Sequence, residues 1–203
     1  MAERKLIRLE DMLSILDKEE FNESETNLIN QQLIPNVSAA VERFCKRNIL
    51  DSAALTEYYN GDGTNLLILD QCPVNSITSI KDRQDNPTSY GSDAYDNTLT
   101  ADEDYIIYDA KAGMLMNPTG SWISSPPYYY QVVYRAGWVI SEIPHDIRLA
   151  VQSWVAILFQ KTTSGVHGVD THIFGDESLT YDNNAIPKAV KNLLVPYIKR
   201  DFV

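Results

Sequence analysis

The sequence contains few cysteine and histidine side chains. Among its 203 residues there are two cysteines, Cys45 and Cys72, and three histidines. The two cysteines lie in different predicted elements and form neither a CxxC nor a CxxH pattern, which excludes a disulfide-rich secreted scaffold and the common zinc sites. We therefore expect both cysteines to be small buried hydrophobic residues.

Long apolar runs are also missing. No stretch approaches the roughly 18 consecutive apolar residues that a membrane span requires. The first residues, MAERKLIRLEDML, are amphipathic and charged, and they lack the apolar core and the small-residue cleavage site of a signal peptide. These absences predict a protein that is made in a reducing cytoplasm and has no membrane partner.

Basic side chains are scarce as well. The chain has 17 Lys and Arg against 28 Asp and Glu, a formal net charge of -11. Proteins that bind nucleic acid use Lys and Arg to displace counterions from phosphates, so the excess of acidic side chains argues against a nucleic-acid-binding protein. Much of the excess lies between Gln84 and Ala110, where seven carboxylates occur without any Lys or Arg. The first half of that segment is predicted to be a solvated loop.

Helical periodicity dominates the two ends of the chain. Apolar residues at spacings of three and four predict a short helix over Leu9–Leu16 and a second over Ile29–Phe44. Pro35 lies inside the second pattern and is expected to kink or break that helix. A third helix is predicted from Pro144 to Leu158 and a last one from Pro187 onward.

The middle of the chain is predicted to form short strands. They are predicted at Leu55–Tyr59, Leu66–Leu69, Val74–Lys81, Tyr105–Tyr108, Met114–Met116 and Tyr128–Arg135. The sequence Asn60-Gly61-Asp62-Gly63 predicts a hairpin between the first two strands, because Gly tolerates a positive φ. Ala110-Lys111-Ala112-Gly113 predicts a second hairpin.

These elements predict an α+β fold. We expect a mainly α-helical bundle of about four helices that carries an inserted, small antiparallel β region. Residues 1–54 would supply the N-terminal helices, residues 55–137 the β insertion, and residues 138–203 the C-terminal helices of the same bundle. A long, Gly-rich loop is expected over residues 162–185, and loops of that length are usually functional or disordered.

No catalytic or cofactor-binding motif is present. Gly61-Asp62-Gly63 lacks the third Gly of a nucleotide-binding turn, and neither GxSxG nor HExxH occurs. His167 and His172 share the segment HGVDTH, but their five-residue spacing is not a recognised zinc geometry. His145 follows a helix-opening proline and is expected at the surface. The sequence therefore predicts no cofactor, no metal and no enzymatic activity.

A rival hypothesis remains open in the acidic β region. Asp102-Glu103-Asp104 could bind calcium, although the Gly and the terminal Glu of an EF-hand loop are missing, and a charged turn is the simpler interpretation. Trp122 and Tyr128–Tyr130 could stack on sugars or bases, or could alternate between core and surface as strand residues. The alternative function is thus a ligand-binding or hydrolytic domain for carbohydrate or calcium.

The order of several loose motifs carries more information than any one of them. VERFCKRNI (41–49) is followed by PVNSITSIKD (73–82), DEDYIIYDAKAGML (102–115), YYYQVVYRAGWVISEIPHDIRLAVQSWV (128–155) and IPKAVKNLLVPYIKR (186–200). In this order the chain resembles the head–tail connector (adaptor) family of tailed bacteriophages and prophages, also labelled phage DNA-packaging proteins. The resemblance extends from about Leu9 to Arg200.

The resemblance implies a non-enzymatic protein located in the virion, at the head–tail interface, and made in the cytoplasm of the bacterial host. Such connectors form a homo-oligomeric ring of about twelve copies beneath the portal vertex, with one surface patch meeting a different patch on the neighbour. The ring extends the DNA channel and docks a stopper or tail-completion protein. The expected partners are therefore the portal protein and that next protein, while double-stranded DNA passes without specific binding.

The resemblance also indicates where docking takes place. The loop after the third helix and the last helix are the docking parts of the family, so we expect them to be mobile in the free monomer and to order on assembly. The basic last helix is expected to meet an acidic portal surface. The candidate interface residues are Val166, His167, Phe174, Leu179, Tyr181, Lys191, Tyr197, Lys199, Arg200 and Phe202.

Overall fold

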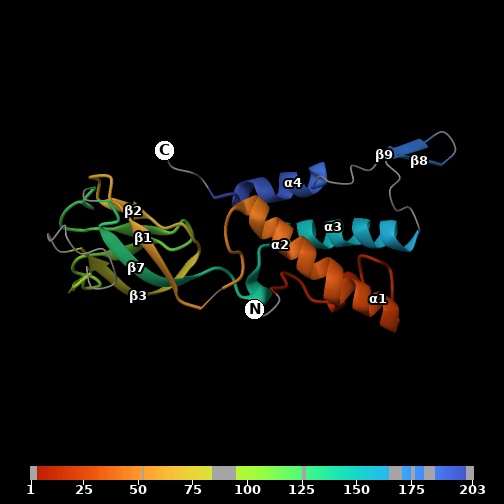
Figure 1. The fold of residues 1–203 in the computed structure, drawn as a ribbon, viewed down its shortest axis with the longest axis horizontal. Coiled ribbons are helices and arrows are strands. Elements are labelled where there is room, and N and C mark those ends of the chain that lie inside the picture. Colours follow the sequence, from red (N-terminus) through yellow and green to blue (C-terminus); the bar gives the residue numbers. More distant parts are fainter. Residues whose placement is uncertain are drawn as a thin grey trace. The chain divides into compact units, whose positions relative to one another are not determined.

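The chain divides into two compact units. The computed structural model describes residues 4–51, 53–83, 95–124, 127–164, 171–174, 177–180 and 186–199 (Figure 1). Both ends of the chain build the first unit, Met1–Arg47 with Ile140–Val203, which we call the helical unit. The continuous segment Asn48–Val139 forms the second, which we call the β unit.

A long helical run crosses the helical unit. It consists of α1 (Glu23–Asn27), a π-helical segment (Leu28–Leu33) and α2 (Ile34–Cys45) (Figure 1). A capping box begins the run, because the Asn22 side chain accepts a hydrogen bond from Glu25 N at 2.9 Å and the Glu25 carboxylate accepts one from Asn22 N at 3.2 Å. The left-handed backbone of Lys46 ends it.

Pro35 interrupts the hydrogen-bond pattern of this run without ending it. A proline lacks the N–H that an α-helix needs, and its ring crowds the carbonyl one turn back. The π-helical segment directly precedes Pro35, and Ile34 N donates to Ile29 O, five residues earlier. This wider, π-type turn lies directly before Pro35. The expected kink is therefore a local change of helix type, and the chain stays helical from Glu23 to Cys45.

The helical unit contains further helical elements. They are a 3₁₀ turn (Glu10–Met12), a 3₁₀ turn (Ile140–Glu142), α3 (His145–Thr163), and α4 (Lys188–Leu194) with a 3₁₀ extension (Val195–Tyr197). In Figure 1, α4 lies alongside α3, and both contact α2. None of the helices within the described ranges is both long and apolar enough to cross a bilayer.

Aliphatic side chains fill the core of the helical unit. Its buried hydrophobic residues are Leu6, Ile7, Met12, Ile29, Ile34, Val37, Val41, Cys45, Ile143, Ile147, Ala150, Val151, Val155, Ala156, Phe159, Val190 and Leu194. The buried hydroxyl of Ser38 accepts a hydrogen bond from Leu6 N at 3.0 Å, which ties the N-terminal segment to α2. Cys45 is fully buried, as predicted, whereas Cys72 is half-buried, and the two are not joined in a disulfide bond.

Two antiparallel sheets make up the β unit. The first has the order β1 (Leu55–Tyr59), β7 (Tyr130–Ala136), β3 (Val74–Asp82), β4 (Asn97–Thr98), and the second has the order β2 (Leu66–Ile68), β6 (Met114–Met116), β5 (Ile106–Asp109). Strand β7 is central, since it pairs with β1 from Leu55↔Tyr134 to Tyr59↔Tyr130 and with β3 on its other side.

Aromatic side chains fill the core of the β unit. The Trp122 side chain is fully buried and makes an edge-to-face contact with Tyr130, with ring centroids 4.9 Å apart. Its Nε1 donates to Asn65 O at 3.1 Å. Around this pair lie Tyr59, Leu67, Leu69, Val74, Ile80, Tyr105, Leu115, Tyr129, Val132, Tyr134 and Ala136. The β unit thus has a hydrophobic core of its own.

The hairpin predicted at Asn60–Gly63 does not form, because β1 pairs with β7 and β2 pairs with β6. The glycines serve a different purpose here. A Cβ on Gly61 would lie 2.1 Å from the Trp122 carbonyl oxygen, so only glycine permits this close approach of two backbone segments. Gly61 N and Gly63 N donate to Ile123 O and Trp122 O. The second predicted hairpin, β5 with β6, is confirmed.

The predicted fold class, a mainly α-helical bundle of about four helices with a small β insertion, is wrong. Among the described residues only α2 and α3 exceed ten residues, and the first predicted helix reduces to the 3₁₀ turn Glu10–Met12. Seven strands form two antiparallel sheets around an aromatic core. Helical spacing of Leu9, Met12, Leu13 and Leu16 misled the prediction, because only Met12 of these is buried.

A further strand pair lies within the stretch predicted as an irregular loop. The backbone of β8 (Thr171–Phe174) pairs with that of β9 (Glu177–Thr180) in an antiparallel hairpin. The register places Phe174 opposite Glu177 and His172 opposite Leu179.

Candidate functional site

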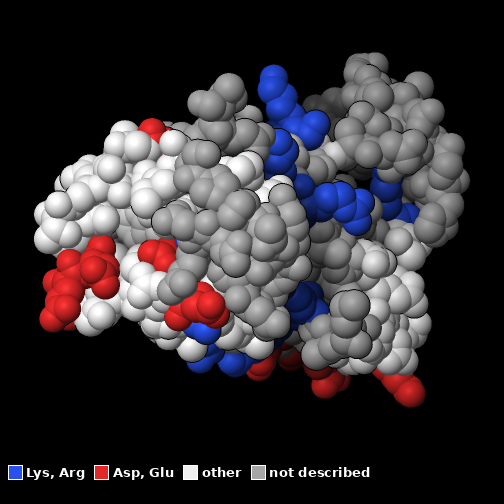
Figure 2. Space-filling model, turned by 60° about the vertical axis from the view of Figure 1, so that its left-hand side comes forward, with Lys and Arg blue, Asp and Glu red and all other residues white. Residues whose placement is uncertain are grey.

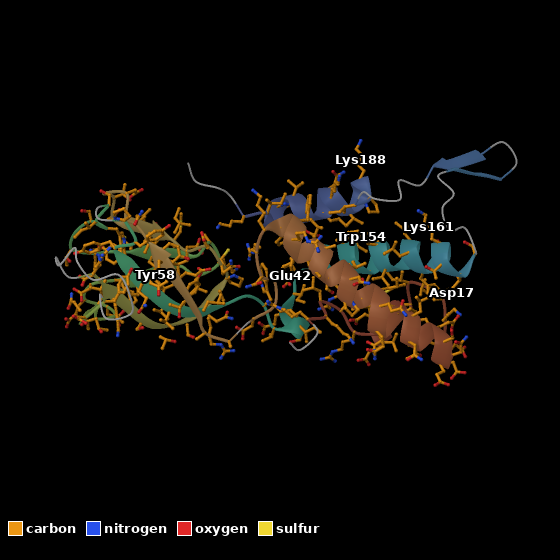
Figure 3. All side chains as sticks on the ribbon, in the orientation of Figure 1. Asp17, Glu42, Tyr58, Trp154, Lys161 and Lys188 are labelled. Carbon is orange, nitrogen blue, oxygen red and sulfur yellow. The ribbon has the colours of Figure 1, made fainter. Side chains whose placement is uncertain are left out.

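The last helix presents two different faces. Val190 and Leu194 of α4 are buried, which fixes the helix against α3 and α2. The opposite face carries exposed Lys188, Lys191 and Asn192, followed by Val195, which is 57% exposed. We call these four residues the α4 surface. In Figure 3 the Lys188 side chain extends outward from α4.

The chain after α4 is anchored to the helical unit. Lys199 N donates to Cys45 O at 2.8 Å, and the Tyr197 hydroxyl lies 3.5 Å from Asp146 Oδ2. Burial, and then the Asp146 carboxylate, raise the pKa of the Tyr197 hydroxyl. Tyr197 and Lys199 are half-buried, so part of each side chain serves the fold. Of the two lysines among the candidate interface residues, Lys191 is the more exposed.

The structure brings only some of the candidate interface residues together. Lys191, Tyr197 and Lys199 lie on α4 and its extension. Phe174 and Leu179 lie on β8 and β9, where the backbone alone is described. The remaining candidates lie outside the described residues: Val166, His167, Tyr181, Arg200 and Phe202. The expected mobility of the loop over 162–185 stays a prediction.

An acidic groove in the N-terminal segment was missed by sequence reasoning. It has a volume of about 310 Å³ and is lined by Leu9, Glu10, Leu13, Glu19, Glu20, Phe21 and Thr26. Leu9 and Leu13 belong to the predicted helix Leu9–Leu16, and no site is predicted in the segment that follows it. The signal in the sequence is the combination of acidic side chains with Leu9, Leu13 and Phe21 in one short segment. In the structure these three apolar side chains are half-buried.

Local contacts hold the groove in place. Lys18 Nζ donates to Glu25 Oε1 at 2.6 Å, and this hydrogen bond is the main reason why the pKa of the Glu25 carboxyl lies below its usual value. Arg8 N donates to Asp11 Oδ2 at 2.8 Å, and Gln152 Nε2 of α3 donates to Asp11 O at 2.9 Å. The segment between residues 8 and 25 is thus tied both to α1 and to α3.

Charge is divided unequally between the two units. The helical unit has 16 acidic and 13 basic side chains, a net charge of -3, whereas the β unit has 12 acidic and 4 basic side chains, a net charge of -8. Figure 2 shows acidic side chains gathered in clusters on the visible face. Most of the excess acidity of the chain therefore belongs to the β unit.

The stacking-platform interpretation of Trp122 and the tyrosines is wrong. Trp122 is 0% exposed, Tyr130 is 4% exposed and Tyr129 is 9% exposed, so these rings fill the core. Tyr128 is exposed, whereas the two tyrosines that follow it are both buried. The predicted alternation between core and surface holds along β7 from Tyr130 onward, but Tyr129 and Tyr130 are consecutive and both buried.

The acidic residues near Asp102 close a turn. Asp104 Oδ2 accepts a hydrogen bond from Thr100 N at 2.7 Å, and Asp102 N donates to Tyr105 O at 2.9 Å. Within the part of the chain that the structure describes, no three His, Cys, Asp or Glu side chains are grouped to hold a metal ion. His145 is exposed at the first position of α3, as expected.

Comparison with known proteins identifies the family. A family model described as head completion protein matches residues 5–200, nearly the whole chain. The chain is therefore a structural protein of the head–tail junction of a phage-like particle, and it belongs to the head completion protein family. This confirms the family and the connector function that the order of the sequence motifs implied. No curated protein sequence matches the chain significantly.

Solved structures share the fold. A chain in the neck of an empty gene transfer agent particle, computed with C6 symmetry, matches with a TM-score of 0.58 and 13% identity, covering 98% of this chain and 92% of that chain. A chain in the neck of the native particle, computed with C12 symmetry, matches with a TM-score of 0.53 and 12% identity, covering 100% and 98%.

Proposed function

We propose that this connector assembles as a closed ring of about twelve copies beneath the portal vertex. The observation that carries the proposal is the match of the whole fold to a chain in a particle neck computed with C12 symmetry. The two-unit architecture spans 98–100% of this chain in these matches, so the shared fold includes the helical unit and the β unit. The chain would be made in the host cytoplasm and incorporated into the virion.

In this proposal the ring extends the DNA channel and docks a stopper or tail-completion protein on the side away from the portal. The charge of the β unit supports passage of DNA without specific binding. A net charge of -8 repels phosphates, and only four basic side chains are available in that unit to displace counterions. The candidate interface residues on α4 and on the β8–β9 hairpin are part of this proposal as contact positions within the assembled particle.

Deleting the gene from the phage or prophage that encodes the chain tests the function. We expect DNA-filled heads without tails in electron micrographs and a loss of tailed particles of at least a hundredfold, with restoration when the chain is supplied in trans. Purified chain should co-sediment with portal protein. Tailed particles at the wild-type level, or a chain that is absent from purified particles, would contradict the proposal.

A further inference from the structure

The helical unit carries two surfaces of opposite chemistry. The acidic groove combines an apolar floor with exposed carboxylates, and the α4 surface combines exposed ammonium groups with an exposed valine. We propose that the acidic groove of one copy receives the α4 surface of the neighbouring copy, and that this contact joins the subunits of the ring. The inference rests on the proposed ring and names the residues that close it.

The groove suits side chains of a protein partner better than a small ligand. Its volume of about 310 Å³ is at the lower end of the roughly 300–1,000 Å³ of ligand pockets, and it is open to solvent. Leu9, Leu13 and Phe21 offer an apolar surface, while Glu19 and Glu20 are exposed at the rim. Residues 10–25 contain seven carboxylates and one basic side chain, Lys18, which is already paired with Glu25.

The α4 surface has the complementary pattern. Lys188, Lys191 and Val195 follow one another at three- and four-residue spacings, so they lie on one face of the helix. Residues 186–199 contain three lysines and no acidic side chain. Because Val190 and Leu194 hold the opposite face in the core, the ammonium groups and the valine are presented on a fixed helix rather than on a flexible tail.

One copy does not fill its own groove. Helix α3 packs against α4 and also contacts the 3₁₀ turn Glu10–Met12 that borders the groove. In Figure 3, Asp17 and Lys188 lie on opposite sides of α3. The chain after α4 is tied to Cys45, at the end of the helical run, whereas the groove residue Thr26 lies near its start, roughly 30 Å away along the helix axis.

A second copy fits both surfaces at once. Each chain presents one acidic groove and one α4 surface at separate places, which is the arrangement of a heterologous contact that can close into a ring. A portal or tail protein would have to be basic to fill the groove and acidic to cover α4. A neighbouring copy of this chain supplies both partners, and it buries Val195 against an apolar floor.

Disulfide crosslinking in assembled particles tests the contact. The full chain carrying Glu20→Cys and Lys191→Cys should give a ladder of covalent multimers on non-reducing gels after mild oxidation, up to the complete ring. Either single substitution should leave the chain monomeric on the gel. A matched control pairs Lys191→Cys with Glu142→Cys, because Glu142 is an exposed acid of the same unit outside the groove. That control should give no ladder.

Charge reversal tests the same contact without a crosslink. Lys188→Glu with Lys191→Glu should weaken each subunit contact by about tenfold, since two exposed ion pairs are replaced by contacts between like charges. Adding Glu19→Lys and Glu20→Lys to the same chain should restore ring yield to within about threefold of wild type. All four side chains are exposed, so thermal unfolding of the free chains should be unchanged.

The outcomes separate this inference from the proposed function. If amine crosslinking of wild-type particles gives a full ring while the cysteine pair stays monomeric, the contact assigned here is overturned and the ring stands. If Lys191→Cys alone crosslinks to a different protein of the particle, α4 docks the portal or the next neck protein, and the inference is again overturned. If wild-type particles contain no ring, the proposed function fails together with the inference.

Discussion

The two units differ in how their cores are built. The β unit is one continuous segment, Asn48–Val139, and its core contains Trp122 and five buried tyrosines. The helical unit joins both ends of the chain, and among its buried hydrophobic residues within the described ranges Phe159 alone is aromatic. Two kinds of core within one chain give each unit its own response to mutation and to pH.

The units also treat buried polar groups differently. In the β unit the Tyr59 and Tyr134 hydroxyls both donate to the Glu57 carboxylate, and they accept hydrogen bonds from Asp70 N and Gln71 N at 2.8 and 3.1 Å. This network links β1 and β7 to the segment before β3. The helical unit relies instead on Ser38 and on the capping box of α1. Stability in the β unit thus depends more on hydroxyl groups that can ionise.

The largest effect is expected from Trp122→Ala. The fully buried indole should cost the β unit about 3–5 kcal/mol of unfolding free energy, because both its contact area and its cavity-filling role are lost. Denaturant unfolding followed by near-ultraviolet circular dichroism reports mainly on the β unit, which holds two of the three Trp and ten of the twelve Tyr residues, and ellipticity at 222 nm reports on the helices. Tyr128→Ala, at a position that is 63% exposed, is the control and should change stability by less than about 0.5 kcal/mol. Equal losses by both probes would show that the units unfold as one block.

The reciprocal substitution is Leu194→Ala in the helical unit. Leu194 is fully buried, so we expect a loss of about 2–5 kcal/mol in the 222 nm transition. The near-ultraviolet transition of the β unit should stay at its wild-type midpoint. Val195→Ala, next in the chain but 57% exposed, should leave both transitions within about 0.5 kcal/mol. A destabilised Val195→Ala variant would mean that the α4 surface belongs to the core.

Alkaline pH should destabilise the β unit. Burial is the main cause that raises the pKa of Tyr59 and Tyr134 above the ordinary 10.0. Both keep their protons in the folded state when the unfolded chain has lost them, so stability is complete below pH 10 and falls as the pH rises further. We expect a loss of about 1.4 kcal/mol per pH unit for each tyrosine in the β unit.

The matched variants for this prediction are Tyr134→Phe and Tyr108→Phe. Tyr134→Phe should reduce the alkaline slope and cost about 1–2 kcal/mol at neutral pH, because Glu57 loses a donor and Gln71 N loses an acceptor. Tyr108 is 61% exposed, and its substitution should alter neither quantity. The measurement is denaturant unfolding between pH 9 and pH 11. An unchanged slope in Tyr134→Phe would assign the alkaline sensitivity to other tyrosines.

The smallest effect is expected at the start of the long helical run. Asn22→Ala removes the capping box and should cost the helical unit about 0.5–2 kcal/mol, visible at 222 nm. Asn27→Ala, at an exposed position inside the run, is the control and should be neutral.

The Glu25 carboxylate should make the helical unit sensitive to acid. The pKa of the Glu25 carboxyl lies below 4.5, first because of the hydrogen bond from Lys18, so the contribution of the carboxylate to stability is present above pH 4.5 and is lost on acidification below it. Wild-type acid sensitivity in Glu25→Gln would contradict this assignment.

Local patterns predicted the strands well and their pairing poorly. Alternation and turn residues located β1 and β6 at their observed bounds and predicted the β5–β6 hairpin. The failure at Asn60–Gly63 comes from a contact between Gly61 and Trp122, which are far apart in sequence. A glycine that permits a close backbone approach has the same local signature as a glycine in a tight turn, so the sequence cannot separate them without the partner segment.

The candidate site shows the same limit. The basic face of α4 followed from its lysines, and Lys191 lies on it as an exposed residue. The acidic groove was missed because Leu9 and Leu13 have helical spacing, although the chain there forms only a 3₁₀ turn that buries Met12. By contrast, the family could be recognised, since the order of its motifs extends along nearly the whole chain and does not depend on any single turn.

The split of the helical unit between the two chain ends also sets an order of events on the ribosome. Helix α2 is complete at Cys45, but α3 begins at His145, a hundred residues later. At about 5–20 residues per second, the apolar face of α2 waits roughly 5–20 s for its partner. The β unit is synthesised in full during that interval and can fold before the helical unit closes. A nascent connector therefore covers the apolar face of α2 last, once α3 has been synthesised.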